Sequence, residues 1–214
     1  MSTPIDFTLY LITDRLQTGT RTLLEVVEEA LAGGVKAVQL REKELTSREL
    51  YELAFEMKKL TIRYGAKLLI NDRIDIALAV DADGVHLGSG SIPVYRARKL
   101  LGKNRLIGVS CHNQVNAITA QEKGADFITF GPVFYTASKA KYGKPVDIDK
   151  LESVSHLLTI PVFAIGGVNA TNTREVLTTG ATGIALISAI IAAREPRQAA
   201  QTLLSLLPAA TVTP

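Results

Sequence analysis

Short apolar runs alternate with longer amphipathic stretches along the whole chain. Eight of the apolar runs have the length and the aliphatic or aromatic content of buried strands. They cover residues 9–13, 37–41, 67–71, 85–88, 106–111, 127–131, 162–166 and 183–188. Because a helical pattern separates each run from the next, the sequence predicts a parallel sheet made of βα units.

The stretches between these runs repeat apolar residues at helical spacing. Leu23, Val27 and Leu31 would share one face of the first predicted helix, and a capping box of Thr46 and Glu49 would start the second. The predicted helices cover residues 20–32, 46–64, 73–80, 94–101, 114–123, 149–157, 171–179 and 196–207.

Several strands are preceded by a similar sequence, which indicates one unit copied around a closed structure. The copies are Gly33-Gly34-Val35-Lys36, Asp81-Ala82-Asp83-Gly84, Gly124-Ala125-Asp126 and Gly180-Ala181-Thr182-Gly183. Eight βα units predict an α/β fold, a single-domain (β/α)8 TIM barrel over residues 1–214, with a frayed tail at 208–214. The alternative is an open doubly wound sheet, but no Gly-x-Gly-x-x-Gly follows the first strand.

Composition and charge narrow the functional classes. The 24 basic and 21 acidic residues are interspersed, so the net charge of +3 favours small anionic ligands about as well as nucleic acid, and no basic block is present. The single cysteine, Cys111, excludes an intrachain disulfide and a Cys-based zinc cluster. The start lacks the layout of a signal peptide and no run is long enough to span a membrane, so we expect a cytoplasmic protein that acts without membrane or nucleic acid.

Active sites of barrels gather at the carboxyl ends of the strands. After the second strand, alternation places Gln39, Arg41 and Lys43 on one side, where they could hold a polyanion. The alternative is an internal ion pair of the basic residues with Glu42 or Glu44.

The third strand ends in Asn71 and Asp72. An Asp beside an Asn can ligate Mg²⁺, which prefers oxygen ligands and usually keeps substrate phosphates in its shell. Asp72 could equally cap the helix expected from Arg73.

Two histidines lie at the ends of the next two strands. His86 and His112 could do acid–base chemistry or could be structural hydrogen-bonding residues.

Two further segments suit a phosphate. Gly166 and Gly167, with Ser188 and the start of a short helix, could form a backbone phosphate cradle, or the glycines could serve only a tight turn. The loop at 136–144 carries two aliphatic hydroxyls and three lysines, which suits a phosphate-bearing ligand or a solvated surface loop.

Six segments, in unbroken order over nearly the whole chain, together resemble the thiamine-phosphate synthase family. They are Leu9-Tyr10-Leu11-Ile12-Thr13-Asp14, Gln39-Leu40-Arg41-Glu42-Lys43, Ile70-Asn71-Asp72, Gly108-Val109-Ser110-Cys111-His112, Gly131-Pro132-Val133-Phe134 with Thr136-Ala137-Ser138-Lys139, and Ile165-Gly166-Gly167 with Ile187-Ser188.

The resemblance implies the coupling of 4-amino-2-methyl-5-pyrimidinylmethyl diphosphate with a thiazole phosphate. The products would be thiamine phosphate and diphosphate, Mg²⁺ would be required, and diphosphate would leave first to give a pyrimidine-stabilised cation. The resemblance assigns Gln39, Arg41, Lys43 and Lys139 to the leaving diphosphate, Asp72 to the metal, Asn71 and Ser110 to the pyrimidine and diphosphate, and Thr136, Ser138, Gly166, Gly167, Ile187 and Ser188 to the thiazole phosphate.

One position departs from the family pattern. Ser91 stands where the synthases usually have the Asp that is the second metal ligand. The segment Gly88-Ser89-Gly90-Ser91 resembles a sister branch, the thiazole tautomerases, in which His112 would be the acid–base group. Lys43, Asp72 and the Thr-x-Ser-Lys loop favour the synthase over the tautomerase. A third hypothesis is a non-catalytic ligand-binding or regulatory barrel. A homo-oligomer is compatible with the sequence.

Overall fold

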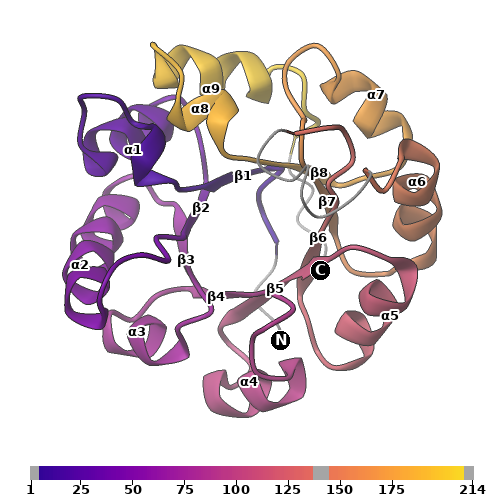
Figure 1. Cartoon of the computed structure of the whole chain (residues 1–214), viewed down its shortest axis with the longest axis horizontal. Helices are drawn as coiled ribbons and strands as arrows, with labels where there is room; N and C mark the ends of the chain where they lie inside the picture. The colour runs from indigo at the N-terminus through magenta and orange to yellow at the C-terminus, as the bar shows by residue number, and fades with distance from the viewer. Residues whose placement is uncertain (1–4, 137–144, 210–214) are drawn as a thin grey trace.

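The computed structural model describes residues 5–136 and 145–209. Eight parallel strands form a closed barrel in sequence order, and helices surround it (Figure 1). The strands are β1 Leu9–Ile12, β2 Ala37–Leu40, β3 Lys67–Asn71, β4 Gly84–Leu87, β5 Leu106–Cys111, β6 Phe127–Phe130, β7 Val162–Ile165 and β8 Gly183–Leu186. The predicted single-domain (β/α)8 barrel is confirmed, and the predicted strand boundaries differ from these by two residues at most.

The helices follow the predicted order. They are α1 Leu23–Ala32, α2 Ser47–Arg63, α3 Ile74–Ala79, α4 Val94–Leu101, α5 Gln114–Glu122, α6 Ile148–Leu157, α7 Thr173–Thr178, the short α8 Ser188–Ile191 and α9 Pro196–Leu204. The 3₁₀ turn η1 Arg15–Gln17 was not predicted. Helix α1 begins three residues later than expected because Thr22 forms the N-terminal capping box with Glu25.

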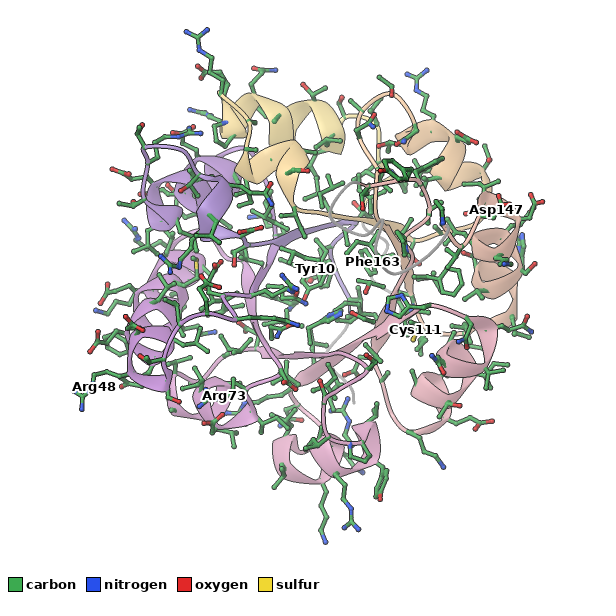
Figure 2. The ribbon with its side chains drawn as sticks, viewed as in Figure 1. Tyr10, Arg48, Arg73, Cys111, Asp147 and Phe163 are labelled. Carbon is green, nitrogen blue, oxygen red and sulfur yellow. The ribbon has the colours of Figure 1, made fainter. Side chains whose placement is uncertain are left out.

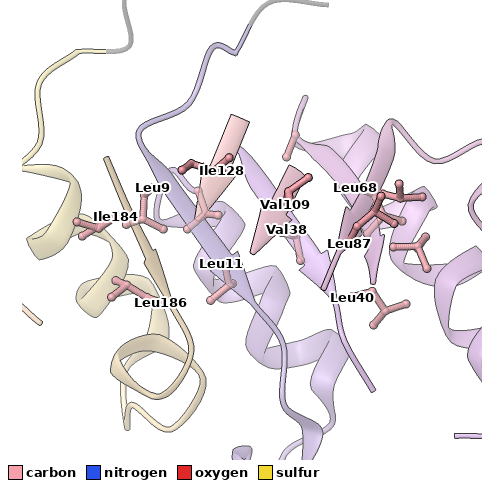
Figure 3. Packing of buried hydrophobic residues seen from close by; sticks show 14 of the residues in the cluster. Leu9, Leu11, Val38, Leu40, Leu68, Leu87, Val109, Ile128, Ile184 and Leu186 are labelled. Carbon is pink, nitrogen blue, oxygen red and sulfur yellow. The ribbon is translucent and has the colours of Figure 1, made fainter. Parts of the chain in front are cut away.

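Alternation along each strand divides the core into two layers. Leu9 and Leu11 of β1 belong to the outer layer, between barrel and helices, as do Val38, Leu40 and Leu68 (Figure 3). The barrel interior is filled by a smaller, aromatic cluster: Phe7, Tyr10, Ile12, Ala37, Leu69, Leu106, Phe127, Phe163 and Ala185. Each fully buried large side chain contributes about 1.5–3 kcal/mol, so the barrel is a packed core with its chemistry at one rim.

The barrel closes between β1 and β8, where Tyr10 pairs with Ala185 in parallel register. In Figure 2, Tyr10 and Phe163 lie within the ring of strands, whereas Arg48 and Asp147 lie at the periphery. Among the described residues, no helix combines the length and apolar character that crossing a bilayer requires.

Candidate active site

The predicted site residues of the described chain lie at the carboxyl ends of the strands. Because all eight strands are parallel in one closed barrel, these ends form a single rim. The basic residues after β2 and the glycines after β7 therefore belong to the same face of the molecule, as the sequence predicted.

A chain of side-chain hydrogen bonds crosses the barrel just beneath this rim. The Gln39 amide nitrogen lies 3.2 Å from Tyr10 Oη, which lies 3.4 Å from His86 Nδ1. On the other side of the ring, His86 Nε2 lies 3.0 Å from Ser110 Oγ. Thr129 Oγ1 lies 3.4 Å from both His86 Nε2 and Ser110 Oγ. These bonds join five strands, β1, β2, β4, β5 and β6.

His86 is a structural hydrogen-bonding residue in this chain. Burial, with a smaller contribution from the positive charge of Arg41, lowers the pKa of His86 to about 3. The neutral ring is also packed against Tyr10 and Phe127. Burial likewise raises the pKa of Tyr10 far above its ordinary value. Neither side chain therefore carries charge at neutral pH, and the acid–base role considered for His86 is not supported.

Arg41 and Lys43 are not held by the ion pairs that the sequence left open. Glu42 is buried and accepts hydrogen bonds from Thr13 Oγ1 and from the backbone N–H of Arg15, while Glu44 pairs with the Arg15 guanidinium at 2.6 Å. In residues 5–136 and 145–209, no ion pair involves Arg41 or Lys43. Their charges are available to an anionic ligand.

Glu42 was singled out from the sequence only as a possible ion-pair partner of the basic residues. It fixes the segment after β1 to the segment after β2, and burial raises the pKa of its carboxyl group against the opposing effect of those hydrogen bonds. Thr13 Oγ1 also accepts a hydrogen bond from the Arg41 backbone N–H at 2.9 Å. The position of Arg41 thus depends, through Thr13, on the buried Glu42 carboxyl group.

Asp72 occupies a constrained position at the end of β3. Its φ is 64°, a left-handed conformation that Asp tolerates better than most residues. Its backbone N–H donates to the His86 carbonyl at 2.9 Å. The capping alternative was wrong, because the N-cap of α3 is Arg73, without a side-chain capping bond. Arg73 pairs instead with Asp75, at 2.5 Å.

The exposed Asp72 carboxylate borders a cleft of about 270 Å³, together with Lys43, Asn71 and Arg73. Within the described ranges, no group of three or more His, Cys, Asp or Glu side chains is placed so that it could hold a metal ion. Mg²⁺ often binds through one or two carboxylates, several waters and substrate phosphates. A single accessible carboxylate beside basic residues fits that mode, and does not fit a metal cage made by the protein alone.

Two residues near the rim are tied to the backbone. Ser91 Oγ accepts a hydrogen bond from the Gly88 N–H at 2.7 Å, which closes the segment after β4 on itself. His112 Nδ1 lies 2.5 Å from the Gly131 carbonyl, so this nitrogen is the donor. His112 thereby joins the segment after β5 to the end of β6.

A second cleft, of about 340 Å³, lies after β7 and β8. It is lined by Gly166, Gly167, Ile187 and Ser188, with Thr136 and Gln17 at its edge. The predicted cradle residues are therefore brought together. Gln17 was missed because η1 has no signal in the hydrophobic pattern; its amide is held 2.6 Å from Asp14 Oδ2.

The two glycines are required by the backbone as well as by the cleft. Their φ values are 93° and 70°, and a Cβ on Gly166 would lie 2.4 Å from Pro132 Cβ. Glycine is thus needed for conformation and for close packing, in addition to any ligand. Ser138 and Lys139 of the predicted basic loop lie outside the described residues.

Comparison with known proteins identifies the family. The family model described as "Thiamine monophosphate synthase" matches residues 9–190. A "Putative thiamine-phosphate synthase" of Geobacter sulfurreducens is 61% identical over 97% of both chains, and a "Thiamine-phosphate synthase" of Clostridium novyi is 46% identical over 93% of this chain and 98% of its own. The solved structure of "Thiamine phosphate pyrophosphorylase" from Pyrococcus furiosus superposes with a TM-score of 0.85 at 41% identity, covering 93% of this chain and 94% of that one. The chain belongs to the thiamine monophosphate synthase family.

Proposed function

We propose that this chain is a thiamine-phosphate synthase, a transferase that couples 4-amino-2-methyl-5-pyrimidinylmethyl diphosphate with thiazole phosphate to give thiamine phosphate and diphosphate. The observation that carries the proposal is the presence of two clefts on one rim, one lined by Lys43 and Arg73 together with Glu42 and Asp72, and one by Gly167 and Ser188. A coupling reaction between two phosphorylated substrates needs both.

The cleft lined by Lys43 and Asp72 would receive the diphosphate. Arg41 and Lys43, with Lys139, would stabilise the negative charge that develops as diphosphate leaves. Gln39, which is 1% exposed and donates to Tyr10 Oη, would support this site from beneath the rim. Because no described carboxylate pairs with Arg41 or Lys43, their charge is not neutralised before the substrate binds. This arrangement supports a dissociative step in which a pyrimidine cation forms before the new bond.

Mg²⁺ is the proposed cofactor, and Asp72 would hold it. When bound, the metal would neutralise charge on the leaving diphosphate. Asn71, at the end of β3, and Ser110, near the end of β5, would position the pyrimidine and diphosphate from either side of β4.

The second cleft would seat the thiazole phosphate. Backbone N–H groups at Gly166, Gly167, Ile187 and Ser188 would face the phosphate, with Thr136 and Ser138 at its edge. A phosphate fixed there leaves the thiazole nitrogen free to capture the cation on the other side of the rim.

The tautomerase and the non-catalytic barrel are not favoured, because the relatives carry the name of the synthase. A cytoplasmic location and a homo-oligomer stay predictions from the sequence.

The test is direct coupling. Purified protein, Mg²⁺ and the two substrates should give thiamine phosphate, detected by chromatography. Arg41→Ala should reduce the rate at least about a hundredfold, as expected for loss of a charge that acts in the transition state. Arg63→Ala, an exposed arginine at the end of α2, is the matched control and should couple normally. A wild-type protein that never couples, but in which His112 is needed for proton exchange on a thiazole carboxylate phosphate, would replace this proposal with the tautomerase.

A further inference from the structure

The hydrogen-bond chain beneath the rim has a fixed direction. Its inner members are almost completely buried, with Tyr10 0%, Gln39 1% and His86 2% exposed, and only Ser110, at its end, is partly open to the rim. A buried polar group that lacks a partner is costly, so each donor in such a chain must meet an acceptor.

The Gln39 amide sets the direction in which Tyr10 donates its proton. The Gln39 amide nitrogen can only donate, and it faces Tyr10 Oη at 3.2 Å. The phenol therefore accepts from Gln39, and its own proton is left for His86 Nδ1 at 3.4 Å. Tyr10 thus makes Nδ1 the acceptor nitrogen of the imidazole.

The hydrogen bond from Tyr10 also determines which nitrogen of the His86 imidazole carries the proton. A neutral histidine has one donor and one acceptor nitrogen. With Nδ1 accepting from Tyr10, the proton lies on Nε2, which faces Ser110 Oγ at 3.0 Å. Thr129 Oγ1 donates to the same Ser110 Oγ at 3.4 Å, and it lies at the same distance from His86 Nε2, from which it can accept.

Ser110 consequently accepts hydrogen bonds from below and keeps its own proton for the rim. We propose that Tyr10 and His86 are positioning residues that fix one imidazole tautomer and so present Ser110 to the substrate as a hydrogen-bond donor. The group that Ser110 meets must then be an acceptor, such as a phosphate oxygen or an unprotonated ring nitrogen. This inference rests on the proposed coupling function only for the identity of the substrate.

The resting protein tests the direction without any substrate. Nitrogen NMR of the histidine-labelled chain should show His86 neutral, with the proton on Nε2 and an unprotonated Nδ1. In Tyr10→Phe the preference should weaken, because Nδ1 loses its donor. A proton found on Nδ1 in the wild-type protein would overturn the proposal, whether or not the protein couples its substrates.

Kinetics test the consequence. Tyr10→Phe should lower kcat for coupling roughly five- to tenfold, the value of about one oriented hydrogen bond, with a smaller change in KM. If Tyr10 acts through Ser110, the same substitution in a Ser110→Ala background should have almost no further effect. Full additivity of the two substitutions would contradict a positioning role.

Phe163→Leu is the matched control for packing. Phe163 contacts Tyr10 in the same aromatic cluster, with ring centroids 6.3 Å apart, but it has no group in the hydrogen-bond chain. The Phe163→Leu substitution should lower the thermal midpoint of unfolding. It should not shift the His86 tautomer, and the coupling rate should still depend on Ser110. A loss of kcat equal to that of Tyr10→Phe would show that packing, and not proton direction, is responsible.

Discussion

At the scale of single residues, Ser91 stands where the family resemblance leads us to expect the Asp of a second metal ligand. Its hydroxyl accepts from the Gly88 N–H at 2.7 Å and so stabilises the turn after β4. An Asp could accept the same hydrogen bond with one carboxylate oxygen and keep the other for a metal. With Ser91, the proposed Mg²⁺ site would have Asp72 as its carboxylate, whose left-handed backbone stores strain of about 1–3 kcal/mol.

We predict that Ser91→Asp lowers the Mg²⁺ concentration needed for half-maximal coupling by about tenfold. One added charge near a divalent ion at a partly exposed site contributes about 1–2 kcal/mol. Titration with Mn²⁺, followed by paramagnetic resonance in the presence of the pyrimidine diphosphate, checks binding separately from activity.

Ser89→Asp is the matched control for Ser91→Asp, because it adds the same charge to the same exposed turn. It should shift the metal dependence much less. Equal effects of the two substitutions would mean that Mg²⁺ responds only to the added negative charge of the loop, and not to a carboxylate at position 91.

At the scale of elements, the repeated sequence before the strands has a specific structural use. Asp83, Asp126 and Thr182 each donate their backbone N–H to one residue of the preceding strand. Each accepts, through its side chain, the N–H of that same residue. The pairs are Leu68 with Asp83, Ile107 with Asp126 and Val162 with Thr182. These reciprocal bonds set the register at the amino ends of β3–β4, β5–β6 and β7–β8, opposite to the active-site rim.

Thr182→Val tests this use of the motif. The substitution keeps the shape but removes the acceptor for the Val162 N–H, now 3.3 Å from Thr182 Oγ1. Leaving a partly buried donor unpaired should lower the free energy of unfolding by about 1–2 kcal/mol, measured by urea denaturation. Thr178→Val on exposed α7 should change it by less than about 0.5 kcal/mol. A Thr182→Val protein as stable as that control would mean that the reciprocal bond has no role in register.

At the scale of the whole molecule, the ring of helices closes where the last helix meets the first. Helix α9 packs against α1, next to the closure of the barrel between β1 and β8 (Figure 1). At the end of α1, a Cβ on Gly33 would lie 2.6 Å from the Arg197 carbonyl and 2.9 Å from Ala200 Cβ. The close approach of α9 therefore depends on a glycine whose φ of −78° any residue could adopt.

We predict that Gly33→Ala lowers the free energy of unfolding by about 1–3 kcal/mol, because it overpacks the contact between α1 and α9. Local propensity alone predicts the opposite, since Ala is favoured over Gly in a helix by about 1 kcal/mol. Gly90→Ala, with nothing near its added methyl group, is the control and should be almost neutral. Chemical denaturation of both variants measures the sign of the change in the free energy of unfolding. A stabilised Gly33→Ala protein would contradict the packing argument.

The sequence alone was sufficient for the eight units, their order and the rim on which the site would form. Alternation of apolar residues, capping boxes such as Thr46 with Glu49, and glycine before several strands act over a few residues, so they can be read without coordinates. Once the strands are parallel, their carboxyl ends must share a face, which is why Arg41, Asp72, Gly166 and Ser188 could be grouped in advance.

Only the tertiary structure decided how the side chains at that rim are held. The Tyr10 to His86 bond joins residues 76 apart, and the bond from Thr13 to Glu42 joins residues 29 apart. No local periodicity encodes such pairs, so the burial of Glu42, the place of Gln17 at the phosphate cleft and the failure of Asp72 to cap α3 could not be foreseen. Local pattern determines which elements form, whereas long-range packing determines which partner each polar side chain meets.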